Sequence, residues 1–253
     1  MEEGVSGKVS GNNREVKTVF NLSAGPDIYL DGGNLDQVKD FAKDLLKGFT
    51  FNPSLFRKLG VKDYFQHSVK VVEACRGLPV SLEVLDDTIE GIIRQGRILG
   101  EIADHVFVKV PVQLTTGQST AEAVKVLAAE QVRLNITAVF THQQVVELLP
   151  DLGNGEHIIS VFAGRIFDLG IDAVSVTRQI CETVHQKSQC RVLWASPRMA
   201  YDFTNARLAG CDIITMSPDL IAKLMQADKS PEQFSLETVR MFYTDAIAAG
   251  YQL

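Results

Sequence analysis

The chain has 253 residues, of which 45% are hydrophobic and 22% are charged, and its formal net charge is −6. This length and composition suit one soluble domain with a full hydrophobic core, and α/β barrels commonly use this length as a single unit. The acidic balance, without a run of lysine and arginine, argues against nucleic acid or an anionic membrane surface as a partner.

The first residues differ in composition from the rest. Residues 1–24 are polar and rich in Gly, Ser and Asn, which predicts a flexible leader ahead of one domain over residues 25–253. The leader lacks the basic start and apolar core of a signal peptide, and no transmembrane run follows. No Cys-x-x-Cys pair occurs among Cys75, Cys181, Cys190 and Cys211. We therefore expect reduced core thiols in a cytoplasmic protein, and the scattered histidines predict no metal site.

Short apolar runs alternate with amphipathic segments along the remaining chain. Strands are predicted at 27–31, 48–51, 79–84, 105–112, 133–139, 157–162, 191–195 and 212–216. Helices are predicted at 35–47, 54–59, 63–75, 87–101, 120–129, 141–149, 170–187, 199–208, 218–226 and 231–248. Eight such units predict a (β/α)8 TIM barrel with an extra C-terminal helix. An open doubly wound sheet fits less well, because the turn after the first strand lacks Gly-x-Gly-x-x-Gly.

The fourth predicted strand contains a lysine, Lys109, within a β-branched apolar run that ends at Pro111. From this stretch alone, a lysine that extends its amine to water is the commoner outcome. The alternative is a buried amine. Burial disfavours the charged form, and an uncharged amine can form a Schiff base with a carbonyl substrate.

Polar residues stand near the ends of the other predicted strands, where barrel enzymes place their active sites. They are Asp31, Asn52, Glu83, Asn135, Thr137, Ser160, Arg165, Ser196 and Arg198. Each has a structural explanation of its own, such as a helix cap or a turn, but their recurrence at successive strand ends favours a site. The carboxylates can move the protons of imine chemistry, and the arginines can bind a phosphate.

These strand ends resemble, in order, those of the transaldolase family, which includes the fructose-6-phosphate aldolases. The matching segments are 30–31, 50–55, 81–84, 108–111, 134–137, 160–165, 195–198 and 208–212. The resemblance implies a class I Schiff-base enzyme without a cofactor, in which Lys109 forms the imine and Asp31 transfers protons. It implies that Glu83 and Thr137 position the catalytic water. It further implies sugar contacts by Asn52, Ser54, Asn135 and Ser160, and phosphate binding by Arg165, Ser196 and Arg198.

Two residues bear on the reaction type. Phe162 stands where the free aldolases of the family carry tyrosine, and Glu83 stands where they tend to carry glutamine. The resemblance therefore implies a transaldolase, which moves a dihydroxyacetone unit from a ketose phosphate to an aldose phosphate. It also implies a homo-oligomer and a place in the pentose phosphate pathway.

Four alternatives remain open at this point. They are a fructose-6-phosphate aldolase of the same family, a transaldolase for a modified sugar such as a sulfosugar or antibiotic-sugar precursor, a metal-dependent aldolase, and an inactive sugar-phosphate-binding barrel. The modified-sugar alternative arises because the chain departs from the family pattern around the predicted pocket, at Gly32, Phe51, Val161 and Pro197.

Overall fold

The computed structural model describes residues 22–40, 45–225 and 229–252. The chain divides into two units, one over residues 21–224 and one that contains residues 225–253, and each is described by itself. The predicted flexible leader lies outside the described residues, except that Leu22–Ala24 form a 3-10 turn. The prediction that one domain extends to residue 253 stays a prediction.

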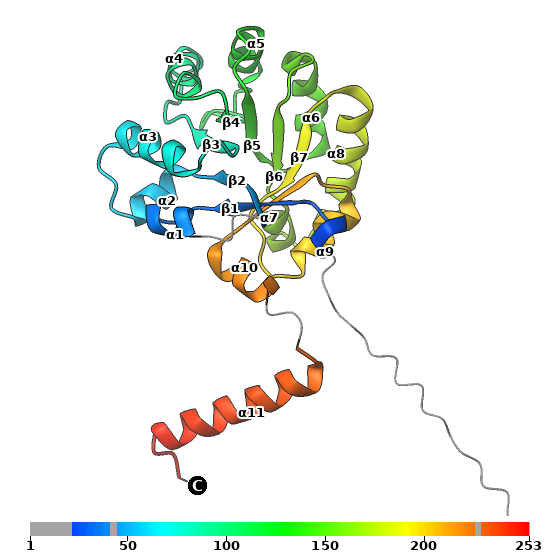
Figure 1. Ribbon diagram of the computed structural model, residues 1–253. Helices are drawn as coiled ribbons and strands as arrows, with labels where there is room; N and C mark the ends of the chain where they lie inside the picture. Colours follow the sequence, from blue (N-terminus) through cyan, green and yellow to red (C-terminus); the bar gives the residue numbers. More distant parts are fainter. Residues whose placement is uncertain (1–21, 41–44, 226–228, 253) are drawn as a thin grey trace, which may run out of the picture. The chain divides into compact units, whose positions relative to one another are not determined.

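The first unit is a closed barrel of eight parallel strands, which neighbour one another in chain order (Figure 1). The strands are β1 Asp27–Asp31, β2 Leu46–Thr50, β3 Val80–Glu83, β4 Val106–Pro111, β5 Leu134–Val139, β6 Ile158–Val161, β7 Arg191–Trp194 and β8 Ile213–Met216. The helices are α1 Leu35–Asp40, α2 Pro53–Lys58, α3 Tyr64–Ala74, α4 Ile89–Gly100, α5 Ala121–Ala129, α6 His142–Leu148, α7 Ala163–Asp168, α8 Ala173–Lys187, α9 Asp202–Ala209 and α10 Pro218–Met225. The predicted (β/α)8 TIM barrel is confirmed.

Two of the differences from the predicted elements concern helices. The helix predicted over 35–47 is described only to Asp40, and β2 already begins at Leu46, whose Cα pairs with Ile28 of β1. The short helix α7 was not predicted, since Gly164 lowers its helix propensity. A Cβ on Gly164 would lie 1.6 Å from the carbonyl oxygen of Ser196, so the close approach of α7 to the end of β7 requires glycine.

The barrel interior has an apolar layer below a polar one. Because successive side chains of a strand point to opposite faces, every second residue faces inward. The apolar layer consists of Tyr29, Phe107, Ile158, Leu193, Ala195 and Ile213. Two positions further along the strands, toward their carboxyl ends, stand Asp31, Lys109, Ser160 and Thr215. This offset of two residues places a layer of polar side chains directly above the packed apolar layer.

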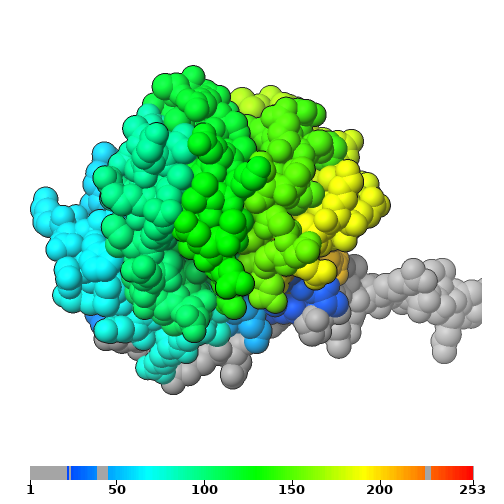
Figure 2. All heavy atoms as spheres, turned by 90° about the horizontal axis from the view of Figure 1, so that it is seen from above, coloured from blue at the N-terminus to red at the C-terminus, as the bar shows by residue number. Residues whose placement is uncertain are grey.

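The outer faces of the strands are covered by the helices, which follow one another side by side from α3 in cyan to α8 in yellow (Figure 2). The outward-facing side chains of β4, namely Val106, Val108 and Val110, are at most 2% exposed. Strands buried on both faces explain the continuous apolar runs in the sequence. All four cysteines are buried and free, as predicted.

The described part of the second unit contains the helix α11, Pro231–Ala248. Its start is fixed by a capping box between Ser230 and Gln233, with a proline in the first turn. The helix carries exposed apolar side chains, including Phe234, Val239 and Phe242, at about 60% exposure each. Within the described residues, no helix has the length and apolar character needed to cross a membrane.

Candidate active site

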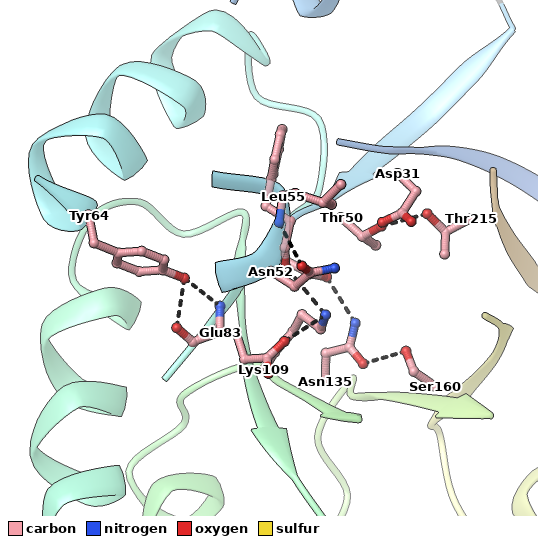
Figure 3. A network of polar contacts seen from close by, with 12 residues as sticks. Asp31, Thr50, Asn52, Leu55, Tyr64, Glu83, Lys109, Asn135, Ser160 and Thr215 are labelled. Carbon is pink, nitrogen blue, oxygen red and sulfur yellow. Dashed lines mark hydrogen bonds and ion pairs between the residues drawn. The ribbon is translucent and has the colours of Figure 1, made fainter. Parts of the chain in front are cut away.

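A network of polar side chains lies at the carboxyl ends of β1 to β6 and β8 (Figure 3). The members that belong to strands come from inward-facing positions, which are set by the period of two along each strand. Because all eight strands are parallel, their carboxyl ends meet at one mouth of the barrel, where barrel enzymes hold their active sites. The fold therefore brings together residues that are up to 184 positions apart in the chain, from Asp31 to Thr215.

Lys109 lies at the centre of this network. Its side chain is 8% exposed, and Nζ lies 3.0 Å from Oε2 of Glu83. Nζ also donates a hydrogen bond of 3.3 Å to the carbonyl oxygen of Phe51. Glu83 and Lys109 are paired residues of neighbouring strands, so the barrel register sets their contact. The sequence left two alternatives for this lysine, an exposed amine or a buried one. The structure has the buried amine, and a carboxylate lies beside it.

Asp31 is the second acid of the mouth. Oδ1 of Asp31 accepts a hydrogen bond of 2.9 Å from the hydroxyl of Thr50, its paired neighbour on β2. Burial raises the pKa of the Asp31 carboxyl, against the lowering effects of the nearby Lys109 ammonium and of the Thr50 hydrogen bond. A carboxyl with a raised pKa is suited to both accepting and donating a proton near neutral pH.

Asn135 connects three strands on the other side of Lys109. Its amide nitrogen donates to the hydroxyl of Ser81 at 3.0 Å, and its amide oxygen accepts from Ser160 at 2.6 Å. All three side chains are at most 2% exposed. These two bonds fix the orientation of the Asn135 amide, with its nitrogen toward β3 and its oxygen toward β6.

Thr137 differs from its neighbours because its hydroxyl is buried and has no hydrogen-bond partner in the part of the chain that the structure describes. It pairs with Pro111, two residues beyond Lys109 on β4, so it lies on the lysine side of the mouth. The register of β5 is interrupted between Ile136 and Val139, and Ala138 has a left-handed φ of 58°. A bulge at this point bends the strand and changes the direction of the side chains at its end. An unpaired buried hydroxyl is suited to hold a water or a substrate hydroxyl.

Asn52 and Ser54 stand at the start of α2. The side-chain oxygen of Asn52 caps this helix by accepting from the Leu55 amide at 3.0 Å, and its NH2 group takes no part in the cap. Ser54 is exposed in the first turn. The cap is therefore a structural role that Asn52 has beside any role in binding.

The two predicted phosphate-binding arginines follow β6 and β7. The guanidinium of Arg165 lies 5.1 Å from the ring centroid of Phe162, and this ring packs against the apolar layer of the barrel interior. Arg198 is exposed and forms an ion pair with Asp168. The loop between them is constrained, since Ser196 has a left-handed φ of 61° and the Gly164 amide donates to the Ala195 carbonyl at 3.4 Å. These contacts bring the first turn of α7 against the loop after β7.

Four side chains of the network were not predicted from the sequence: Thr50, Ser81, Thr215 and Tyr64. Thr50 and Thr215 sit at strand ends in the same way as the chosen residues, so strand-end position would have been a sufficient signal for them. Tyr64 lies on α3, and no signal in the sequence indicates that its side chain reaches β3. Among the described residues, no group of three or more His, Cys, Asp or Glu side chains could hold a metal ion.

Comparison with known proteins gives one consistent result. The family model described as transaldolase/fructose-6-phosphate aldolase matches residues 28–252. A protein of Exiguobacterium sibiricum named "Probable transaldolase" is 34% identical over 200 residues, covering 78% of this chain and 89% of that protein. One of Bacillus cereus with the same name is 33% identical over 212 residues, covering 81% and 94%.

Solved structures of lower identity share the fold. A dihydrodipicolinate synthase is 10% identical, with a TM-score of 0.57 over 88% of this chain and 81% of that one. Deoxyribose phosphate aldolase from Aeropyrum pernix is 12% identical, with a TM-score of 0.52 over 78% and 86%. At these identities the likeness concerns the barrel alone.

Proposed function

Because the chain belongs to the transaldolase/fructose-6-phosphate aldolase family, we propose that it transfers a dihydroxyacetone unit from a ketose phosphate to an aldose phosphate. The observation that carries this proposal is the Lys109 amine, held inside the barrel mouth at 3.0 Å from the Glu83 carboxylate. A lysine in this position has the shelter and the neighbouring acid that Schiff-base chemistry needs.

The proposed reaction begins at the ketone carbon of the donor. Nζ of Lys109 in its uncharged form adds to this carbon, and loss of one water gives the imine. The bond between C3 and C4 then breaks, the C4 hydroxyl gives its proton to the Asp31 carboxylate, and an aldose phosphate leaves. The electron pair of that bond stays on the lysine-bound three-carbon unit as an enamine. No metal is required, because the imine accepts the electrons.

The second half reverses these steps on an acceptor. The enamine carbon adds to the aldehyde carbon, and the aldehyde oxygen takes the proton back from Asp31. Water then attacks the imine and frees the product and the lysine. The Glu83 carboxylate lies 3.0 Å from the lysine amine, and the unpaired Thr137 hydroxyl belongs to β5, the neighbour of the lysine strand on its other side. Both positions support the proposal that these groups orient this water.

Binding of the two substrate ends is assigned to separate parts of the mouth. Asn52, Ser54, Asn135 and Ser160 are proposed to contact the sugar hydroxyls. Arg165, Ser196 and Arg198 are proposed to bind the phosphate, since guanidinium groups give charge-assisted, bidentate hydrogen bonds to phosphate oxygens. Phosphate sites of barrels commonly lie near the late strands, which agrees with the position of these residues after β6 and β7.

Transfer, rather than release of free dihydroxyacetone, is supported by Phe162. Its ring carries no hydroxyl, so it cannot protonate the enamine, and the three-carbon unit waits for an acceptor aldehyde. If the chain is instead a fructose-6-phosphate aldolase, dihydroxyacetone accumulates from the donor alone. The cytoplasmic location, the homo-oligomer and the place in the pentose phosphate pathway stay predictions.

Trapping of the imine tests the proposal. The protein is incubated with fructose 6-phosphate and borohydride, digested, and the adduct is located by mass spectrometry. We expect a reduced three-carbon adduct on Lys109, no adduct in Lys109→Met, and an unchanged adduct in Lys125→Met, whose lysine is exposed on α5. Retained turnover in Lys109→Met would refute the proposal.

The remaining alternatives give different outcomes in the same assay. An inactive binding barrel would show no adduct, although the sugar phosphate would raise its melting temperature. A metal-dependent aldolase would lose turnover to a chelator and would not be trapped. A transaldolase for a modified sugar would give the same adduct from its own donor and a poor yield from fructose 6-phosphate.

A further inference from the structure

The hydroxyl of Tyr64 makes two hydrogen bonds to the backbone of a single residue, Glu83. It donates to the Glu83 carbonyl oxygen at 2.7 Å and accepts from the Glu83 amide at 3.0 Å (Figure 3). Tyr64 is the first residue of α3, and Glu83 is the last residue of β3. One side chain from an outer helix therefore forms hydrogen bonds with both the N–H and the C=O group of the last residue of a barrel strand.

The position of this contact follows from the lengths of two neighbouring strands. The amide of Phe51 donates to Ser81 at 2.9 Å, after which the chain turns through Asn52 into α2 and leaves the sheet. The N–H and C=O of one strand residue point to the same side, so those of Glu83 point to where β2 would have continued. The Tyr64 hydroxyl occupies that place and supplies both the donor and the acceptor that a neighbouring strand would supply.

The tyrosine ring is itself held in place. It packs against Phe56 with ring centroids 5.1 Å apart, and Phe56 is 2% exposed. The helix that carries Tyr64 is capped by Asp63, whose side chain accepts from the Gln66 amide at 3.0 Å. Burial raises the pKa of Tyr64, so its hydroxyl keeps its proton and both hydrogen bonds through neutral pH.

We propose that Tyr64 is a positioning residue, which fixes the end of β3 so that the Glu83 carboxylate stays at 3.0 Å from the Lys109 amine. This inference rests on the proposed Schiff-base function. On its other side β3 is held by the hydrogen bond of 3.1 Å from the Val84 amide to the Lys109 carbonyl. Without the Tyr64 hydroxyl, the end of β3 is hydrogen-bonded only on the side that faces β4. Glu83 then moves relative to a lysine whose chemistry depends on sub-ångström placement.

Tyr64→Phe tests the inference, because it removes the hydroxyl and keeps the ring. We expect kcat to fall roughly tenfold or more, in line with the cost of misplacing a catalytic group, while KM for fructose 6-phosphate changes little. The matched control is Ser188→Ala. The Ser188 hydroxyl also donates to a carbonyl, that of Val184, and accepts from an amide, that of Cys190, but it lies before β7. We expect that variant to keep its kcat.

A double-mutant cycle separates positioning from a general loss of stability. If Tyr64 acts through Glu83, the substitution Tyr64→Phe lowers kcat in the wild-type chain and leaves it within about twofold in a Glu83→Gln background. An equal fall in both backgrounds, or unchanged kcat in Tyr64→Phe alone, overturns the inference. Borohydride trapping in the wild-type protein is the separate test of the proposed function, so the two failures are distinguishable.

Hydrogen exchange gives a second measurement that does not depend on turnover. The Glu83 amide is expected to be protected in the wild-type protein and to exchange faster in Tyr64→Phe, while the amide of Val84 stays protected. A Glu83 amide that exchanges at the rate of an exposed amide in the wild-type protein overturns the inference without any variant.

Discussion

The hydroxyl oxygens of Thr50 and Thr215 lie 2.5 Å apart, although 165 positions separate them in the chain. The single hydroxyl hydrogen of Thr50 points to Asp31, so Thr215 is the donor between the two threonines. The bonds form a chain from Thr215 through Thr50 to Oδ1 of Asp31, in which each bond polarises the next. This leaves Oδ2 of Asp31 as the oxygen that can exchange a proton with a substrate.

Thr50→Val is expected to move the pH profile of kcat. Burial and the Glu83 charge raise the pKa of Asp31, whereas the charges of Lys109 and Lys58 and the Thr50 hydrogen bond lower it. Loss of the hydrogen bond therefore raises this pKa further, and the acidic limb of the profile shifts to higher pH. Thr50→Ser should restore the wild-type limb, and a limb that stays in place in Thr50→Val would contradict the assignment of that limb to Asp31.

Asp31→Asn is expected to stabilise the fold while it abolishes turnover. Because burial raises the folded-state pKa of Asp31 above its unfolded value, the ionised carboxylate costs stability once the pH exceeds the unfolded value. Asparagine keeps the oxygen that accepts from Thr50 and carries no charge. The melting temperature of Asp31→Asn should exceed that of the wild type at pH 7, and the difference should shrink as the pH falls from the raised folded-state pKa toward the unfolded value near 4. An equal difference at both pH values would argue against a raised pKa.

Thr137→Val is expected to lower kcat on the order of 100-fold, as for loss of one placed hydrogen-bonding group in an active site. The hydroxyl of Thr137 has no hydrogen-bond partner among the described residues, so its removal should leave the melting temperature unchanged or slightly higher. Thr177→Val is the matched control, since the Thr177 hydroxyl is likewise buried and unpartnered, but lies on α8. A control that loses as much activity would refute a specific role for Thr137.

Arg165→Ala is expected to raise KM for fructose 6-phosphate, with a loss of about 1.5–3 kcal/mol for hydrogen bonds to a charged group. Because the guanidinium also lies on the Phe162 ring, a small loss of stability accompanies it. KM for unphosphorylated fructose should not change. Arg97→Ala, which breaks an ion pair with Glu130 on the outside of the barrel, is the control. An unchanged KM in Arg165→Ala would mean that the phosphate binds elsewhere.

Asp168→Asn is expected to lower KM for fructose 6-phosphate by roughly two- to fivefold. The Asp168 carboxylate pairs with Arg198 and competes with a phosphate for its guanidinium. Both side chains are about half exposed, so the pair adds at most about 1 kcal/mol to stability. Titration of KM against salt concentration checks the electrostatic origin, since screening should reduce the difference between the variant and the wild type. A higher KM would show that Asp168 instead holds Arg198 in its binding position.

The sequence by itself determined the barrel and most of the candidate site. Eight apolar runs, each followed by a helical segment, admit few other folds, and the parallel strands of a barrel bring all their carboxyl ends to one mouth. Polar residues at those ends, such as Asp31, Glu83 and Lys109, could therefore be selected without coordinates. The family resemblance rests on the same residues, and the family match confirms it.

Only the tertiary structure decided which of these side chains touch one another. The ion pair of Lys109 with Glu83 depends on the register between two strands, and the contact of Thr50 with Thr215 depends on closure of the barrel between its first and last strands. Tyr64 meets Glu83 because β2 leaves the sheet earlier than β3 and because α3 begins within hydrogen-bonding reach of the end of β3. Register, closure and helix packing arise from contacts between distant segments, whereas the residue pattern of one segment encodes only its own secondary structure and its buried face.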